Sequence, residues 1–232
     1  MSACKKNNTV PQPEAKPKYL TQINRINGNN TTTTTYSYDD KKRLKEINIG
    51  ASTTTFTYIL DRITATETIN KNGNAVVVKI FNQLNYVDNV LATKKTSVYD
   101  GAGQLVTEVS NGYAYDDKSK LTETHQEGNV VFYEHDADGN ISKEKSSSST
   151  YSYTYDGKAS MFANLNSAVK KIGNQLQFSE FYSKGNIASS SRVVGATTTT
   201  TTYTYQYDAE GYPISGTSSS GNTYTYTYST LD

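Results

Sequence analysis

The chain has 232 residues, of which 34% are hydrophobic, and a formal net charge of +1. Balanced charge gives no basic field, which argues against nucleic acid as a partner. Twenty tyrosines supply apolar surface that the few aliphatic residues do not, so the composition favours an ordered domain over a disordered chain.

Residues 1–18 are predicted to lie outside the folded domain. Cys4, preceded by Ser-Ala and followed by two lysines, resembles the cleavage site of a bacterial lipoprotein signal, whose cysteine becomes lipidated. We expect Cys4 to be the lipid attachment site; the alternative is an ordinary free cysteine in a frayed terminus. It is the only cysteine, so a disulfide within the chain is excluded. Pro11, Pro13 and Pro17 predict an extended tether of roughly 3 Å per residue.

From Tyr19 onward the chain reads as one β-strand after another. Segments rich in Thr, Ile and aromatic residues are separated by Asn-Gly, Asn-Asn or Asp turns, and they include residues 19–27, 31–39, 43–50, 53–59, 62–70 and 75–81. In residues 151–155, 203–207 and 224–228 every second residue is a tyrosine and the others are Ser, Thr or Gln. This alternation predicts antiparallel strands with one packed face and one wet face.

A short unit recurs at several strand ends: a tyrosine or histidine, an aspartate, a tight turn, and then a leucine or isoleucine. The aspartate side chain can bond the backbone two residues on, and a glycine three residues later can adopt a left-handed conformation. The turn residues expected on this basis are Asp100, Gly103, Asp136, Gly139, Asp208 and Gly211. Lys42 and Ser119 stand at the glycine position after Asp39 and Asp116, so those two turns are expected to be more strained or differently shaped.

One stretch, at about residues 159–173, breaks the two-residue period. Its apolar residues recur at helical spacing: Met161, Phe162, Leu165, Ala168, Val169 and Ile172. Lysines in the last turn and Gly173 just beyond it are typical of a helix C-terminus. We predict a helix of about twelve residues that plugs an exposed end of the tyrosine face; a partner-binding helix is the alternative.

Some sixteen to eighteen strands are too many for one flat sheet. The fold class expected is therefore all-β: a large, curled antiparallel meander of Tyr-Asp hairpins, open like a half-barrel around one short inserted α-helix. Residues 19–232 are expected to form a single domain. A membrane-spanning barrel is excluded, because its outward face would need apolar residues where this chain has Thr, Ser and Asn.

The Tyr-Asp-x-x-Gly-x-Leu unit, spaced by about 20 residues, resembles the YD repeats of Rhs and teneurin proteins. Over residues 19–230 the chain is similar to a family of Bacteroidetes lipoproteins of unknown function built from such hairpins. The residues that carry this resemblance are those preceding Cys4, the insertion at 155–165 and the segment 207–213. The family often has Asn-Pro-Phe where this chain has Ser160-Met-Phe.

The resemblance implies a lipid-anchored protein of the cell envelope, at the outer membrane, and implies no activity. Surface export in these bacteria commonly goes with acidic residues after the lipidated cysteine. Lys5 and Lys6 stand there instead, which by analogy favours the periplasmic side.

Residues that could carry chemistry are few, and we expect neither an enzyme nor a bound cofactor or metal. Glu123, His125 and Glu127 share a strand face and could in principle hold a metal, but such a trio is more often solvated charge. Asp136–Asn140 looks like the opening of a calcium loop, yet Ile141 stands where that loop needs glycine. No phosphate-binding glycine loop, nucleophile elbow or raised-pKa carboxylate context is present.

Two classes of function remain open. Exposed tyrosines beside Asn, Thr and Ser suit a binding module for a glycan or an extended peptide, because flat rings stack while hydroxyls hydrogen-bond. The candidate ligand-binding residues are Tyr151, Tyr153, Tyr155, Tyr203, Tyr205 and Tyr207. The alternative is a structural scaffold within an outer-membrane assembly, or a sheet whose open edges accept a partner's strand. The same rings could also be simply the core.

Overall fold

The computed structural model describes residues 16–172 and 183–231, which form sixteen strands and one helix. The elements are β1 (Lys18–Asn27), β2 (Asn30–Tyr38), β3 (Leu44–Ile49), β4 (Ser52–Ile59), β5 (Arg62–Asn72), β6 (Ala75–Val87), β7 (Val90–Asp100), β8 (Leu105–Tyr115), β9 (Leu121–Gln126), β10 (Asn129–His135), β11 (Ile141–Lys145), β12 (Thr150–Tyr155), α1 (Ser167–Ile172), β13 (Ile187–Val194), β14 (Thr197–Tyr207), β15 (Pro213–Ser218) and β16 (Asn222–Thr230).

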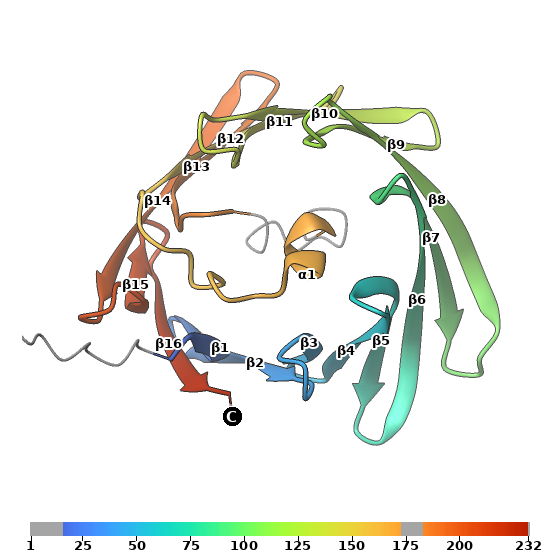
Figure 1. Ribbon diagram of the computed structural model, residues 1–232, viewed down its shortest axis with the longest axis horizontal. Coiled ribbons are helices and arrows are strands. Elements are labelled where there is room, and N and C mark those ends of the chain that lie inside the picture. The colour runs from blue at the N-terminus through green and yellow to red at the C-terminus, as the bar shows by residue number, and fades with distance from the viewer. Residues whose placement is uncertain (1–15, 173–182, 232) are drawn as a thin grey trace, which may run out of the picture.

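The strands form a closed antiparallel barrel, so the expectation of an open half-barrel is wrong (Figure 1). Each strand pairs with its neighbours in sequence, and β1 also pairs with β16 from Lys18–Thr230 to Asn27–Asn222. Closure gives both terminal strands a hydrogen-bonding partner and removes the two edges that an open sheet would leave exposed. The antiparallel, all-β part of the prediction is confirmed.

The alternation of tyrosine with small polar residues places the rings inside the barrel. Tyr224, Tyr226 and Tyr228 of β16 lie opposite Arg25, Ile23 and Leu20 of β1 in the ladder. Leu20 and Tyr226 belong to the same buried cluster, and the two other rings pack against it. Because paired residues share a face, the threonines between the rings face outward.

The junction between each even-numbered strand and the odd-numbered strand that follows it has a repeated arrangement. The register shifts at each of these junctions, for example between Ser37 and Tyr38 and between Thr57 and Tyr58. A tyrosine hydroxyl then donates to the backbone carbonyl of a residue near the start of the preceding odd-numbered strand. The pairs are Tyr38 to Leu20, Tyr58 to Leu44, Tyr86 to Ile63, Tyr115 to Leu91, Tyr155 to Ile141, Tyr205 to Ile187 and Tyr228 to Pro213, at 2.7–3.0 Å.

The Tyr-Asp turns share one backbone geometry. In the Asp136 turn the Asp136 carboxylate accepts from Asn140 N at 2.9 Å, and Gly139 has φ 88°. The Asp100 and Asp208 turns have the same bonds, with Gly103 and Gly211 at φ 80° and 87°. The Asp100 turn lies after the odd-numbered strand β7, at the other end of the barrel.

The outer wall is polar. Ion pairs cross between neighbouring strands, and threonine and asparagine side chains bond across the ladder; examples are Lys79–Glu67, Lys95–Glu108, Lys143–Glu134, Thr33–Asn24, Thr53–Asn48 and Thr204–Thr217. A lipid-facing wall would instead carry an apolar band, because hydrocarbon offers no partner for charges or hydroxyls. The outer face is therefore built for contact with water.

The insertion between β12 and β13 enters one end of the barrel and packs against the inner wall (Figure 1). Phe162, Leu165 and Val169 are 4%, 5% and 0% exposed and join the core of β1–β7. The helix is shorter than expected: α1 has six residues, and residues 161–165 form turns instead. Ser160 accounts for part of this, because its hydroxyl accepts from Phe162 N in a local turn that competes with helix.

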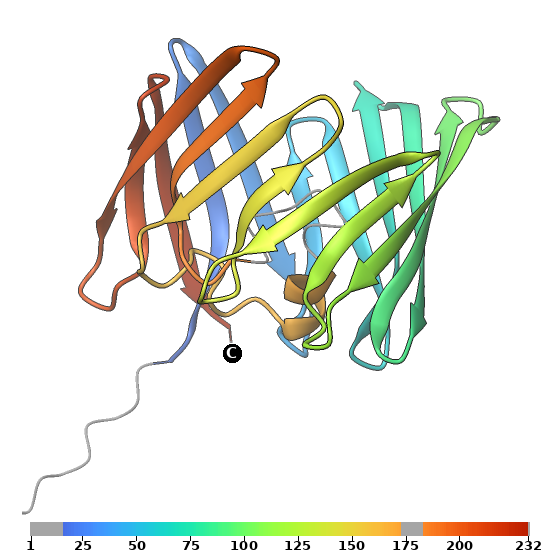
Figure 2. The same ribbon diagram turned by 90° about the horizontal axis from the view of Figure 1, so that it is seen from above.

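Helix α1, the start of β1 and the C-terminal end of β16 lie at one end of the barrel (Figure 2). We name this the plugged end, and the opposite one, with the β1–β2 turn, the far end. Cys4 and most of the expected tether lie outside the described residues. No helix in the described ranges is long and apolar enough to cross a membrane.

Candidate functional site

A cavity of about 410 Å³ lies inside the barrel above the insertion, and it is partly open to solvent. Its walls come from β1–β3 on one side and β13, β14 and β16 on the other. Met161 and Phe162 form its floor. Five tyrosine rings line it: Tyr36, Tyr203, Tyr205, Tyr224 and Tyr226. We call this space the tyrosine cavity.

Strand pairing brings these rings together. Tyr205 of β14 lies opposite Gly216 of β15, which in turn lies opposite Tyr224 of β16. A Cβ atom on Gly216 would lie 3.0 Å from the Tyr205 ring and 3.2 Å from the Thr204 carbonyl oxygen, so the glycine makes room for the ring. Tyr224 and Tyr226 are stacked at 6.4 Å with an interplanar angle of 8°.

The tyrosine cavity contains few charges. Arg25 is one, and its Nε donates to Asn222 Oδ1 at 3.1 Å. The remaining polar lining includes the hydroxyls of Thr32 and Thr34, which pair in the ladder with Arg25 and Ile23. Neutral hydroxyl and amide groups beside aromatic faces bind uncharged polar molecules through hydrogen bonds and ring stacking.

Burial sets the protonation of the interior groups. It raises the pKa of Tyr205 and Tyr226, so both phenols remain neutral hydrogen-bond donors at physiological pH. Burial also raises the pKa of the Glu144 carboxyl, against an opposing hydrogen bond from Tyr153, and lowers the pKa of Lys94. Burial thus disfavours the charged form of these two inward-facing residues, Glu144 and Lys94.

The six predicted tyrosines all face the interior and are half-buried, but they do not form one site. Tyr203 and Tyr205 line the tyrosine cavity, whereas the Tyr207 hydroxyl bonds the Asp156 carboxylate at the neck of the insertion. The three on β12 lie beyond β13. Tyr151 lies under the Arg192 guanidinium at 5.6 Å, and the Tyr155 hydroxyl bonds the Ile141 carbonyl.

Sequence reasoning missed the other half of the cavity wall. Tyr224 and Tyr226 carry the same alternation as residues 203–207 and could have been chosen on that signal. Tyr36 and Arg25 could not, because only closure of β1 onto β16 brings the first strands beside the last.

The residues weighed and set aside as metal or calcium ligands make other contacts. His125 Nε2 lies 2.8 Å from Glu123 Oε2 on the outer wall, and Glu127 stands in the β9–β10 turn with φ 47°. The Asp136 carboxylate accepts from the backbone and side chain of Asn140. Within residues 16–172 and 183–231 no group of three His, Cys, Asp or Glu side chains is arranged to hold a metal ion.

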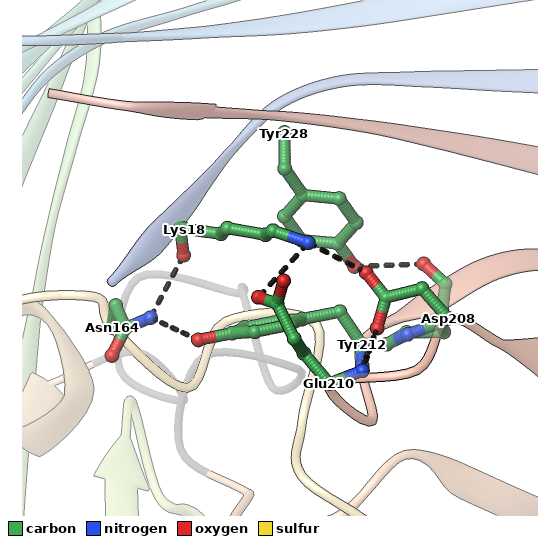
Figure 3. Close-up of polar contacts among 7 residues, drawn as sticks. Lys18, Asn164, Asp208, Glu210, Tyr212 and Tyr228 are labelled. Carbon is green, nitrogen blue, oxygen red and sulfur yellow. Dashed lines mark hydrogen bonds and ion pairs between the residues drawn. The ribbon is translucent and has the colours of Figure 1, made fainter. Parts of the chain in front are cut away.

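The insertion is tied to the start of β1 and to the turn between β14 and β15 (Figure 3). Lys18 Nζ lies 2.9 Å from Asp208 Oδ2 and 3.0 Å from Glu210 Oε2. Asn164 of the insertion donates to the Lys18 carbonyl and to the Tyr212 hydroxyl, each at 2.8 Å. This network joins three parts of the chain that are far apart in sequence.

A second anchor holds the neck of the insertion. Asn186 donates to the Asp156 carboxylate at 3.2 Å and to the Ala159 carbonyl at 3.0 Å, and its Oδ1 accepts from Met161 N. Both ends of the insertion are therefore fastened to each other before the chain re-enters the barrel at β13.

Comparison with known proteins identifies the fold alone. No protein-family model matches the chain, and a search of curated proteins finds no match. The chain resembles a porin-like protein from Bacteroides uniformis, with 14% identity, a TM-score of 0.52 and coverage of 92% of this chain and 98% of that one. A porin-like protein from Bacteroides vulgatus has 13% identity, a TM-score of 0.50 and coverage of 93% and 100%.

A third similar chain comes from the structure of TcdB2–TccC3–Cdc42, with 10% identity, a TM-score of 0.31 and coverage of 82% of this chain and 12% of that one. That likeness carries no argument. The similarity to the two porin-like proteins extends over nearly the whole of each chain and supports the barrel architecture.

Proposed function

We propose that this protein is a binding module that holds a neutral glycan in the tyrosine cavity. The observation that carries the proposal is the lining itself: five tyrosine rings and a set of neutral hydroxyl and amide groups surround a space of about 410 Å³. That volume falls within the range of small-ligand sites, which runs from about 300 to 1,000 Å³.

The distribution of charge favours a sugar over a peptide. Strand-to-strand ion pairs such as Lys79–Glu67 and Lys143–Glu134 lie on the outer wall, whereas the tyrosine cavity has Arg25 as its charged lining residue. A peptide brings charged side chains and a backbone that needs a partner strand, while a sugar brings hydroxyls and flat C–H faces suited to rings.

A glycan array with the purified protein tests this proposal. Tyr203→Ala and Tyr224→Ala each remove one ring from the cavity wall and are expected to weaken binding of a retained glycan about tenfold or more. Phe132→Ala is the matched control, because Phe132 is 50% exposed on the outer wall. If no glycan is retained, or if the control weakens binding as much as the cavity variants, the proposal is wrong.

We further propose that the protein acts in the cell envelope as a lipid-anchored protein. Support comes from the residues around Cys4 and from the water-facing outer wall, which needs a separate anchor to stay at a membrane. The chain enters β1 at the plugged end, so a tether from Cys4 would turn the far end away from the membrane. Incorporation of labelled palmitate that is lost in Cys4→Ser is expected; equal labelling of both proteins would reject the anchor.

A scaffold role in an outer-membrane assembly is the second candidate. The polar outer wall and the closed seam favour the binding module, because closure pairs both terminal strands and leaves them no free edge for a partner strand. Cross-linking in cells that recovers a stoichiometric protein partner, together with an empty glycan array, would favour the scaffold instead.

A further inference from the structure

In several hairpins, the residue just before the first buried residue of the odd-numbered strand occupies an equivalent place. Just before β3 this residue is Arg43, which precedes the buried Leu44, and its guanidinium lies over the Tyr58 ring at 4.3 Å. In β5 it is Arg62, which precedes the buried Ile63 and lies over the Tyr86 ring at 4.8 Å. The two arginines are therefore related by one step of the hairpin repeat.

The first arginine has a carboxylate partner from its own turn. Arg43 Nε donates to Asp39 Oδ2 at 2.8 Å, and its Nη2 lies 2.7 Å from the same oxygen. Asn140 bonds the side chain of Asp136 in the same way at 2.9 Å. In these longer turns, the side chain just before the first buried residue of the strand is thus bonded by the aspartate four residues before it.

Arg62 lacks that carboxylate. Its turn is a two-residue loop between the paired residues Ile59 and Arg62, so Tyr58 stands four residues earlier. Asp61, the nearest acid in sequence, lies 3.6 Å from Arg43 Nη1 instead. Within the described residues Arg62 forms no ion pair; its Nη2 bonds the Asn89 side-chain oxygen, which leaves the rest of the guanidinium edge available.

Arg62 lines a cleft of about 850 Å³ at the plugged end. The cleft lies between α1 and the turns β4–β5, β6–β7 and β8–β9. Val90 and Ala168 contribute apolar surface, and Lys118 contributes a second cation. Asp61 and Asp88 also line the cleft, but Asp61 is paired with Arg43. The two cations of the cleft, Arg62 and Lys118, therefore face one remaining carboxylate, Asp88, and one positive charge is in excess.

Backbone strain is concentrated around the same cleft. Six non-glycine residues in the described ranges have positive φ, and four of them line it: Leu60, Asp88, Asn89 and Ser119. Glycine would adopt these conformations at lower cost, and it does so in the far-end turns at Gly28, Gly50 and Gly73. Strained side-chain-bearing residues cluster where a site needs their side chains, and here Asn89 uses its amide to hold Arg62.

We propose that this cleft, which we name the Arg62 cleft, is a second binding site and that it takes a carboxylate with an apolar body. The Arg62 guanidinium is held flat by the Tyr86 ring below it and the Asn89 amide at one edge, which prepares it for a two-point contact with a carboxylate. The ligand carboxylate takes the place that Asp39 holds beside Arg43. The apolar body lies against Val90 and Ala168. This site is separate from the tyrosine cavity and does not depend on the glycan proposal.

Hexanoate is the probe for this site, and hexanamide is its neutral counterpart. We expect saturable hexanoate binding by calorimetry in the millimolar range, with movement of the Arg62 Nε resonance in nitrogen-15 spectra. Arg62→Gln should weaken binding about tenfold or more, because it removes the charged two-point contact. Arg62→Lys should weaken binding by less.

Arg192→Gln is the matched control, because Arg192 also lies over a tyrosine ring but on β13, away from the cleft. Hexanoate binding should be unchanged in this variant, and circular dichroism should be that of the native barrel for each variant. The proposal is overturned if hexanoate shows no saturation, if Arg62→Gln binds as tightly as the native protein, or if hexanamide binds as well. Inorganic phosphate that binds as tightly as hexanoate would also overturn it, because phosphate has no apolar body.

Discussion

The hydroxyl of Tyr86 donates a hydrogen bond of 2.8 Å to the backbone carbonyl of Ile63, which lies twenty-three residues earlier on the neighbouring odd-numbered strand. The bond spans the place where the ladder between β6 and β7 shifts register, between Asn85 and Tyr86. Burial raises the pKa of Tyr86 to about 12, although the nearby Arg62 opposes this, so the phenol keeps its proton over the physiological range.

Tyr86→Phe tests the value of this bond. The substitution keeps the ring and leaves the Ile63 carbonyl without its phenol partner, so we expect a loss of about 1–2 kcal/mol in the free energy of unfolding, measured by urea denaturation. Tyr151→Phe is the control, because the Tyr151 hydroxyl has no hydrogen bond to any of the residues that the structure describes. Equal losses in both variants would show that the ring environment, and not the bond, determines the effect.

Glu144 makes the stability of the barrel depend on pH. Burial raises its pKa above the ordinary value of 4.5, so folding favours the protonated carboxyl. Its contribution is fully present below pH 4.5 and is lost as the pH rises through the raised pKa of the folded state. Glu144→Gln should therefore raise the unfolding midpoint at pH 7 and leave it unchanged at pH 3.5. A midpoint that falls at pH 7 would mean that the ionised carboxylate is stabilising.

Asn186 holds the neck of the insertion, and its side chain is almost wholly buried at 2% exposure. Asn186→Ala removes the bonds to Asp156, Ala159 and Met161, so we expect a loss of about 2–3 kcal/mol and faster hydrogen exchange at Phe162 and Leu165. Asn85→Ala on the outer wall, which removes one bond of 3.3 Å to Thr93, should change stability by less than about 0.5 kcal/mol. Unchanged exchange in Asn186→Ala would count against this anchoring role.

Leu60 is 86% exposed and has φ 56°, a conformation that costs a leucine about 1 kcal/mol. Leu60→Gly should raise the free energy of unfolding by about 0.5–1 kcal/mol, because little packing is lost and the strain is relieved. Ile59→Gly is the matched control: Ile59 has an ordinary strand conformation, so its replacement by glycine should lower the free energy of unfolding by about 1 kcal/mol. A destabilised Leu60→Gly would contradict the strain and indicate a contact made by the leucine side chain.

Local pattern predicted those features whose cause is local. The alternation in residues 203–207 is enough to place Tyr203 and Tyr205 on one face, because successive side chains on a strand point to opposite sides. The aspartate-glycine spacing of a turn such as Asp136–Gly139 also depends on neighbouring residues alone, and the structure has the expected backbone bonds there. The helix at 160–172 was predicted too long, because the Ser160 turn outweighs the apolar stripe over its first half.

The sequence by itself determined that this chain forms antiparallel hairpins with tyrosines on one side and threonine, serine and charged residues on the other. Only the tertiary structure decided that the sheet closes, because the bonds between Lys18 and Thr230 join residues whose pairing no local pattern reports. Closure then selects which rings share a cavity, bringing Tyr36 beside Tyr203 and leaving Tyr151 apart. The physical reason is that strand alternation acts over two residues, whereas closure depends on the accumulated twist and tilt of sixteen strands.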